Sequence, residues 1–585
     1  MKNRIIAIAL PMLAVSAATA EEQLHKEITV EREIVPELRA ASRLNLYPRP
    51  LVFRQSEATL QLSDYLETGE IATLIAPLEP AQTAAAAPAT PWRGYLDLGY
   101  FPLKKADLSA GYAIVQTDAT RLNLWGQASN TDYKAKPFPG SQKERFWNLD
   151  ATVGLSFSHR FGTAGTLSAS TAYSYDGFTR PLPDQIIGIP YIEPGDKERC
   201  QGVNRWNIGL DWKGNAPRDI TYSAGASFGL LNFRDGSTVS VHDYPIDGYL
   251  KPVGERDFAL RLGFAKRFGD SSVGADFTGD IVRYTRFRSY FADFASGSED
   301  DEYVNPSGKT FGLFDLTPYY RYAAGIISLK AGARLGFSVN SGRVVDIAPD
   351  VLFAVNPASG FGGWLRLGGG KQLNTLASLF EITRYVVPFE APRPSNIPFT
   401  GDLGLRFGPF RGASLTLQLS YAMADDRPMP SSTRYGVVFR GEDLRSWRAK
   451  VELNWAFRSW LALRAGYQAT LGSNRDQTWI DCYDRARHIV SAAVTVRPVE
   501  PLSIDLSYTL RLDRSMGDIP DSSGEFIFDE NLGDESLLNL GVTYRVSAPF
   551  SVFLRGENLL DCRSRIVPDI PREGISGLVG VTWKF

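Results

Sequence analysis

Apolar and polar residues alternate with a period of two along many segments of this chain. In residues 502–513 one face carries leucine, isoleucine and tyrosine, and the other carries serine, aspartate, threonine and arginine. Residues 538–546 and 447–457 repeat the pattern. Because successive side chains of a strand point to opposite faces, each segment predicts a β-strand with one apolar and one polar face.

The length of these segments separates two all-β architectures. Strands of soluble sandwiches usually have about five or six residues, whereas strands that cross a membrane need about nine to eleven. The alternating segments run to about ten residues or more and recur many times, so they match the membrane class. The pattern therefore predicts a transmembrane antiparallel β-barrel rather than a soluble β-sandwich.

Connections between the expected strands alternate between short and long, as outer-membrane barrels with tight periplasmic turns and extended extracellular loops require. The expected short connections are residues 162–165, 214–218, 269–272, 323–325, 408–412, 498–501 and 547–549. The expected long loops are residues 180–203, 234–255, 289–307, 372–398, 424–445 and 472–484. This alternation gives about 22 strands, an even number that leaves both ends in the periplasm. Two further apolar runs, 376–388 and 435–440, then belong to extracellular loops or to strand extensions.

The N-terminal part of the chain differs from the barrel in kind. Residues 1–20 have basic residues, an apolar run and small residues before Glu21, which together predict a secretory signal peptide. Residues 21–91 lack long alternating strands and end in the Pro/Ala-rich stretch 80–91, an extended linker. We therefore expect a short periplasmic or lumenal segment over 21–91 and the barrel over 92–585.

Composition and charge narrow the choice further. Aromatic residues make up 12% of the chain, and the net charge of −2 gives no electrostatic footprint for nucleic acid. No apolar run reaches the roughly 18 residues that a membrane-spanning helix needs. The absence of such a run does not argue against a barrel. Apolar lipid-facing residues alternate with polar lumen-facing residues along each strand, so the mean hydropathy of a barrel strand stays low.

Several motifs in the last third of the chain resemble one family. They are GWLRLGGG (363–370), GDLGLRF (401–407), LTLQLSYAMADD from Leu415, AKVELNWAF from Ala449, LRGENLLD from Leu554, and the terminal VTWKF. In this order they resemble the barrel of TonB-dependent outer-membrane receptors, although Asp402 stands where the family usually has glutamate. Over 92–359 the resemblance is one of strand rhythm. It implies solute uptake across the outer membrane, outer-membrane lipid as surroundings, and the barrel-assembly machinery as a partner during insertion.

The N-terminal part departs from this family. Its receptors carry a plug domain of well over one hundred residues inside the barrel, and about seventy residues precede Trp92 after the expected cleavage. The stretch 26–35 (KEITVEREIV) either resembles the box that binds TonB or is an extended periplasmic segment with alternating charges. Either residues 21–91, inward-folded loops or a partner chain must fill the lumen. The alternative function is therefore a plug-less structural or assembly barrel within an outer-membrane complex.

Candidate chemistry is sparse. Residues 225–229 (GASFG) match a hydrolase elbow around Ser227, but they lie inside an expected strand rather than at a strand–turn–helix. The LGGGK stretch ending at Lys371 lacks the phosphate-loop spacing. The acidic run 299–302 either holds calcium or keeps a loop hydrated, and the pair His242 and Asp243 is the one candidate for a catalytic rim.

The four histidines, His25, His159, His242 and His488, show no zinc-ligand spacing. We therefore predict no catalytic, cofactor-binding or metal-binding residues, no cofactor and no enzymatic activity. Cys200, Cys482 and Cys562 all fall in connections expected on the extracellular side, where oxidising conditions permit a disulfide.

Overall fold

The computed structural model describes most of the chain from Trp92 to the C-terminus. The described residues are 92–101, 105–137, 142–180, 200–234, 237–241, 244–250, 252–285, 310–340, 344–358, 360–388, 391–433, 436–474, 485–515, 517–518, 532–567 and 570–585. Residues 21–91 lie outside this part, so their assignment as a separate segment stays a prediction.

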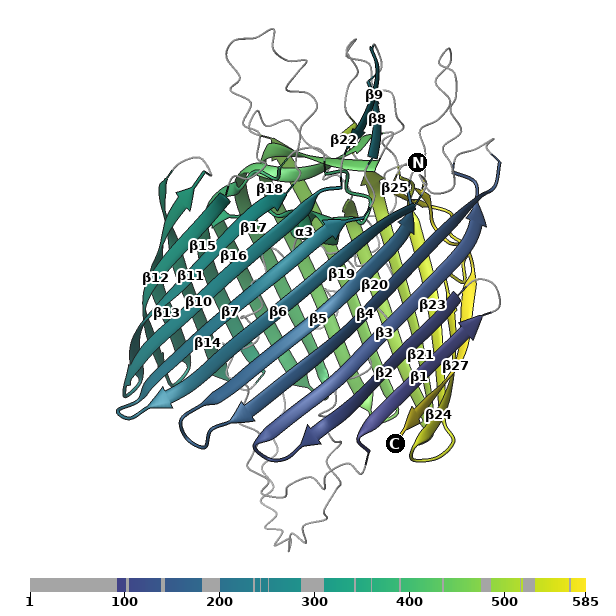
Figure 1. Ribbon diagram of the computed structural model, residues 1–585. Helices are drawn as coiled ribbons and strands as arrows, with labels where there is room; N and C mark the ends of the chain where they lie inside the picture. Colours follow the sequence, from purple (N-terminus) through teal and green to yellow (C-terminus); the bar gives the residue numbers. More distant parts are fainter. Residues whose placement is uncertain are drawn as a thin grey trace, which may run out of the picture. The chain divides into compact units, whose positions relative to one another are not determined.

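The described strands form one closed antiparallel barrel of 22 strands (Figure 1). These strands are β1 (Gly94–Phe101), β2 (Lys105–Gln116), β3 (Thr120–Ala135), β4 (Glu144–Arg160), β5 (Thr166–Thr179), β6 (Cys200–Ala216), β7 (Ile220–Phe233), β10 (Gly254–Phe268), β11 (Ser271–Thr285), β12 (Thr310–Ala324), β13 (Ile327–Val339), β14 (Val345–Ala358), β15 (Phe361–Gln372), β16 (Ser395–Phe410), β17 (Ala413–Thr433), β18 (Gly436–Arg458), β19 (Leu461–Asn474), β20 (Arg485–Val499), β21 (Leu502–Ser515), β23 (Glu535–Arg545), β24 (Phe550–Glu557) and β27 (Ser576–Lys584). The predicted fold class and strand number are confirmed.

Short elements lie in the connections. They are the helix α3 (Leu376–Ile382), the strand pair β8 (Ser237–Val241) and β9 (Tyr244–Leu250), the pair β25 (Arg565–Val567) and β26 (Ile570–Pro571), and β22 (Gly517–Asp518), which pairs in parallel with β17. Within the described residues, no helix is long and apolar enough to cross a membrane.

The two faces of the wall follow the sequence alternation. In β1, Leu98 and Tyr100 are 43% and 59% exposed, whereas the preceding residue Asp97, on the opposite face, is 6% exposed. The same parity places Trp447 on the outer face, with 49% exposure, and the neighbouring Arg448 inside, with 8%. The outer face is therefore apolar and the lumenal face polar, as a bilayer on one side and water on the other require.

Main-chain pairing between the first and last strands closes the barrel. β1 pairs with β27 from Tyr95↔Lys584 to Tyr100↔Val579. Beyond this ladder, the carbonyl of Phe585 accepts hydrogen bonds from the amides of Arg93 and Gly94, both at 2.7 Å. No edge is left along the paired residues of β1 and β27 for water or lipid to solvate.

The connections at one end of the barrel are all short, and most of those at the other end are long, as expected from the alternation (Figure 1). The short connections at the second end join β1 to β2, β13 to β14 and β17 to β18. We call the two ends the short-turn end and the long-loop end. The chain rises from Gly94 at the short-turn end and returns there at Phe585. The apolar run 376–388 lies in the connection between β15 and β16, as predicted.

The prediction of a long loop over 424–445 is wrong, because β17 and β18 continue as a paired hairpin through most of that range. Residues Arg427–Thr433 pair with Gly436–Glu442 beyond a bulge. The paired stretch contains two prolines, Pro428 and Pro430. They are tolerated because β16 pairs with β17 no further than Asp425 and β22 pairs only with Ser431 and Ser432. At the two prolines, β17 therefore has β18 as its one paired neighbour among the described strands, and no amide is needed on its other side.

Candidate functional site

The connection between β15 and β16, residues 373–394, folds into the barrel, and we call it the lumenal loop. Its helix α3 begins with a capping box. Thr375 Oγ1 accepts from the amide of Ser378 at 3.0 Å, and Ser378 Oγ accepts from the amide of Thr375 at 2.9 Å. Leu376, Leu379 and Phe380 follow at helical spacing and are buried. The local sequence thus gives a short helix with one apolar face.

A buried carboxylate on β10 holds the start of this helix. Glu255 is 1% exposed and accepts hydrogen bonds from the amides of Leu376 at 2.5 Å and Ala377 at 3.1 Å. These amides belong to the first turn, which has no partners inside the helix, and a negative charge is favourable there. Glu255 therefore fixes both the position and the direction of α3.

The far part of the lumenal loop reaches the wall at β4. Arg384 donates to both carboxylate oxygens of Asp150, at 3.1 and 3.2 Å. Burial alone would lower the pKa of Arg384, but the Asp150 carboxylate raises the pKa above the ordinary guanidinium value, so this side chain stays cationic. A fork-on-fork pair of this kind fixes orientation as well as charge.

This pair spans much of the barrel. Between β15 and β4 lie eight strands on one side, namely β5, β6, β7 and β10 to β14. Asp150 lies six residues inside its strand and faces the lumen, so the loop can reach it only through the interior. The lumenal loop therefore crosses the lumen from one wall to a distant one.

Arg205 of β6 extends the ionic contact beside Asp150. Its guanidinium lies 3.0 Å from Asp176 of β5 and 3.7 Å from Glu381 of the lumenal loop. The same guanidinium stacks over the ring of Phe380, 5.2 Å from its centroid. The cation Arg205 thus lies between an acidic residue of the wall, Asp176, and one of the lumenal loop, Glu381. Its guanidinium also covers the face of the Phe380 ring.

Aromatic side chains fill the space between the loop and the wall. Phe178 of β5 is 2% exposed, and its ring centroid lies 6.2 Å from that of Phe380 and 5.5 Å from that of Tyr385. Phe233 of β7 meets Phe380 edge-on at 6.3 Å. These residues belong to one buried cluster with inward-facing residues of β3 to β7 and β11, and with Val253 just before β10. The long-loop end of the lumen therefore contains a hydrophobic core rather than a water-lined channel at this point.

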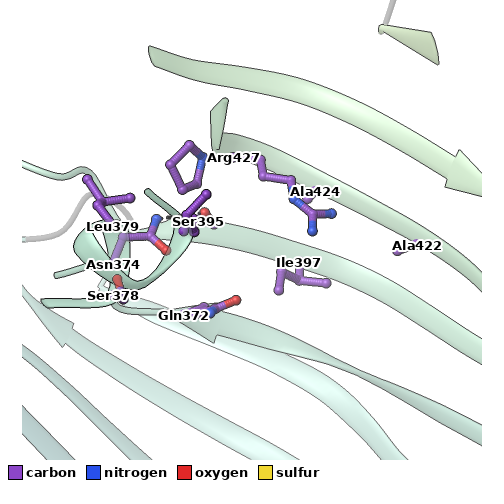
Figure 2. Close-up of a pocket in the computed structure, with 11 residues that line it drawn as sticks. Gln372, Asn374, Ser378, Leu379, Ser395, Ile397, Ala422, Ala424 and Arg427 are labelled. Carbon is purple, nitrogen blue, oxygen red and sulfur yellow. Dashed lines mark hydrogen bonds between the residues drawn. The ribbon is translucent and has the colours of Figure 1, made fainter. Parts of the chain in front are cut away.

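Two more contacts complete the attachment. The lumenal loop adds a short parallel bridge to β18, where Val387 donates to Val437 at 2.8 Å and Val437 donates to Tyr385 at 2.9 Å. Behind α3, a small pocket separates the helix from β16 and β17 (Figure 2). There Asn374 Nδ2 donates to Ser395 Oγ at 2.8 Å. The helix is therefore packed tightly on its β5–β11 side and more loosely on its β16–β17 side.

The connection between β24 and β27 packs against the part of the lumen next to the lumenal loop. Glu535, at the start of β23, is 0% exposed and forms ion pairs with Arg511, Arg514 and Arg572. Tyr133 of β3 donates its hydroxyl to the carbonyl of Pro571 at 2.8 Å. Val567 and Ile570 of this connection join the same buried cluster as the lumenal loop.

The residues that motifs singled out are structural where they are described. Ser227 lies within β7, paired with Ala259, and Lys371 lies within β15 and donates to Ser338 Oγ at 2.7 Å. His159 contacts Thr120 at 2.7 Å and His488 contacts Tyr467 at 2.9 Å. Among the described residues, no group of three or more His, Cys, Asp or Glu side chains is placed to hold a metal ion.

Other candidates lie outside the described residues. These are His25, His242, Asp243, Cys482 and residues 299–302. Cys200 and Cys562 lie at the long-loop end, as the strand count required.

Sequence reasoning missed the residues that hold the lumenal loop. Glu255, Asp150 and Arg384 are single charged residues in alternating or irregular segments. Their partners are 234 and about 120 positions away in the chain. One signal could have found the loop: the apolar run 376–388, which we assigned to a loop or a strand extension, exceeds what an exposed loop needs.

Comparison with solved structures supports the fold. The chain is similar to the ferric enterobactin receptor PfeA from Pseudomonas aeruginosa, with a TM-score of 0.63 and 12% identity over 84% of this chain and 80% of that one. It is also similar to the copper transporter OprC (0.59, 13% identity, 84% and 81%) and to the FrpB iron transporter from Neisseria meningitidis (0.61, 12% identity, 84% and 81%). No protein-family model and no curated protein sequence matches the chain.

These neighbours are named as receptors and transporters, and they define the fold class as a large closed antiparallel β-barrel. More particularly, the resemblance to TonB-dependent receptors that the sequence suggested is confirmed at the level of the barrel fold.

Proposed function

We propose that this protein takes up a solute across the outer membrane as a TonB-dependent-receptor-like transporter, with the lumenal loop as its outer closure. The observation that carries the proposal is the bridge from β15–β16 to Asp150 on β4, which crosses the lumen. Similar barrels are named as receptors for ferric enterobactin and as transporters of copper and iron, which supports uptake as the activity.

The attachment suits a gate better than a permanent seal. The lumenal loop is held by a few defined contacts, chiefly Glu255, Asp150 and Arg205, and its β16–β17 side borders a pocket. A ligand that competes for the ionic contacts would release the loop without unfolding the wall. A ligand shifts such an equilibrium only by its differential affinity for the open state.

Replacing residues 376–387 by a Gly/Ser linker of equal length tests the closure. We expect higher single-channel conductance in planar bilayers and higher sensitivity of cells to large antibiotics, because the lumen loses its hydrophobic core. Unchanged conductance and unchanged sensitivity in a chain that also lacks residues 21–88 would show that the loop is not the closure.

Residues 21–91 are proposed to seal the short-turn end of the lumen. The Pro/Ala linker 80–91 precedes β1 directly, and a dozen such residues reach at most about 35 to 40 Å, enough to cross a barrel mouth. Deleting residues 21–88 behind an intact signal peptide should raise conductance most clearly in a chain whose residues 376–387 are also replaced, because each closure alone blocks the lumen. If it raises conductance only when the lumenal loop is also replaced, the two closures act in series.

Uptake and assembly differ in the partners they require. Purification from outer membranes in mild detergent should give the barrel alone or with a TonB-type protein in substoichiometric amount. A stoichiometric partner that fills the lumen would favour the assembly role instead.

A further inference from the structure

A second surface lies on the outer face of the barrel, away from the lumenal loop. Four exposed cations lie at the long-loop ends of β3 and β4: Lys134 and Arg145 within the strands, and Lys136 and Lys143 in the connection just beyond them. Lys134 and Arg145 are direct cross-strand partners, and Asp132 is the one acidic neighbour that faces the same way. We call these five residues the basic cluster.

Strand parity shows which way the cluster faces. Tyr133 and Ala135 are buried in the lumenal core, so Asp132 and Lys134 point outward. On β4, Phe146 is buried in the same core, so Arg145 points outward. The Arg145 guanidinium is 66% exposed and binds Asp132 through Nε at 2.9 Å. The cluster therefore carries a net positive charge on the outside of the wall.

The bilayer boundary lies directly beneath the cluster. Trp147, two residues from Arg145, shares its outward parity, and the next outward residues on β4 are Leu149, Ala151 and Val153. Aromatic side chains concentrate at the interface of membrane barrels, between the apolar band and the water. Arg145 and Lys134 therefore lie at the level of lipid headgroups.

Below this level, the outer wall is hollowed instead of convex. A groove of about 670 Å³ is lined by residues of β1, β2, β3, β4, β24 and β27, among them Leu98, Leu108, Ala128, Leu149 and Val579. Its floor includes the small residues Ala106 and Ala128, and its lining is almost wholly apolar. Leu149 and Asn130 are cross-strand partners four residues below Arg145 and Lys134, about 13 Å along the strands.

We propose that the basic cluster and this groove together bind one phosphorylated, multiply acylated lipid of the outer leaflet. Phosphate groups pair with Lys134 and Arg145, and acyl chains lie in the groove. The charge complementarity selects an anionic headgroup at the long-loop end, and the position on the lipid-facing wall makes a membrane lipid the occupant.

Binding is measured by native mass spectrometry on the full protein after delipidation, with hexa-acylated diphosphoryl lipid A as the probe. We expect the double variant Lys134→Gln/Arg145→Gln to weaken binding about tenfold, because two charge-assisted contacts are lost. Ala128→Phe, which fills the groove and leaves the charges intact, should also weaken it. Lys266→Gln is the matched control: Lys266 also faces outward and stacks on Phe268, but at the short-turn end.

Each outcome bears on the proposal. Equal weakening by Lys266→Gln, or no effect of either test variant, would overturn it. Binding of dioleoyl phosphatidylcholine as tight as that of the probe would also overturn it, since the headgroup would not matter. Full competition by inorganic pyrophosphate would replace the lipid site by a free phosphate site. Gel mobility before and after boiling checks that each variant is a folded barrel.

Discussion

At the scale of single residues, the ion pair between Arg384 and Asp150 gives the most direct test of what holds the lumenal loop closed. Replacing Arg384 by Met leaves the Asp150 carboxylate partly buried without its cation. We expect this to destabilise the closed loop by about 2 kcal/mol, which raises the open population roughly 30-fold. Single-channel recordings in planar bilayers would show this as more frequent large openings.

A double-mutant cycle separates the pair from its surroundings. Asp150→Asn alone should also open the loop, and the double variant should open it less than the sum of the two single effects, because the partners are coupled. Strict additivity would mean that the contact does not hold the loop.

The contacts of single residues were the part of the molecule least accessible from the sequence. The alternating strands predicted correctly that Arg448 faces the lumen, since parity is a local property. The pairing of Asp150 with Arg384 depends on where the chain returns after many strands, and alternation carries no information about that. Contacts across a lumen join residues far apart in the chain, so they can be identified only once the order of the strands around the closed barrel is known.

At the scale of elements, packing of α3 against the wall predicts how firmly the lumenal loop is held. Phe380→Ala removes a ring that is 6% exposed and touches Phe178, Phe233 and Arg205. Truncating a buried phenylalanine costs about 3 to 5 kcal/mol. Hydrogen exchange of the α3 amides, followed by mass spectrometry, should accelerate by roughly 100-fold or more.

Phe410→Ala is the control for this element. Phe410 is 58% exposed on the outer face near the short-turn end, so its truncation should leave exchange in α3 unchanged. Equal acceleration in both variants would indicate a general loosening of the barrel rather than release of the loop.

A strand could be predicted from the sequence where the alternation of apolar and polar residues was the one signal present. Residues 502–513 alternate strictly and form β21 as expected. Residues 424–445 combine charges and two prolines, and the sequence alone could not show that β17 has lost its neighbour there. An edge position removes the penalty for proline, and edge positions are a property of the sheet rather than of the strand.

At the scale of the whole molecule, closure depends on the last residue. Phe585 exchanges main-chain hydrogen bonds with Gly94, and its ring lies 6.2 Å from that of Tyr112. Removing Phe585 should reduce insertion, because the end of the seam loses these bonds. The fraction of protein that shifts in mobility on boiling measures inserted barrel, and wild-type levels in the truncated chain would contradict this prediction.

The wall is not equally tall around its circumference, and this has a consequence for the bilayer itself. β1 and β24 have 8 residues each, whereas β17 and β18 have 21 and 23. A membrane strand needs about nine to eleven residues, so β1 and β24 fall just below this length and β27 between them, with 9 residues, only just reaches it. Hydrophobic mismatch of this kind costs fractions of a kcal/mol per Å and is relieved by thinning of the adjacent lipid or by tilting of the protein. In a bilayer of longer acyl chains, we therefore expect the barrel to tilt so that its shortest strands remain within the hydrocarbon layer.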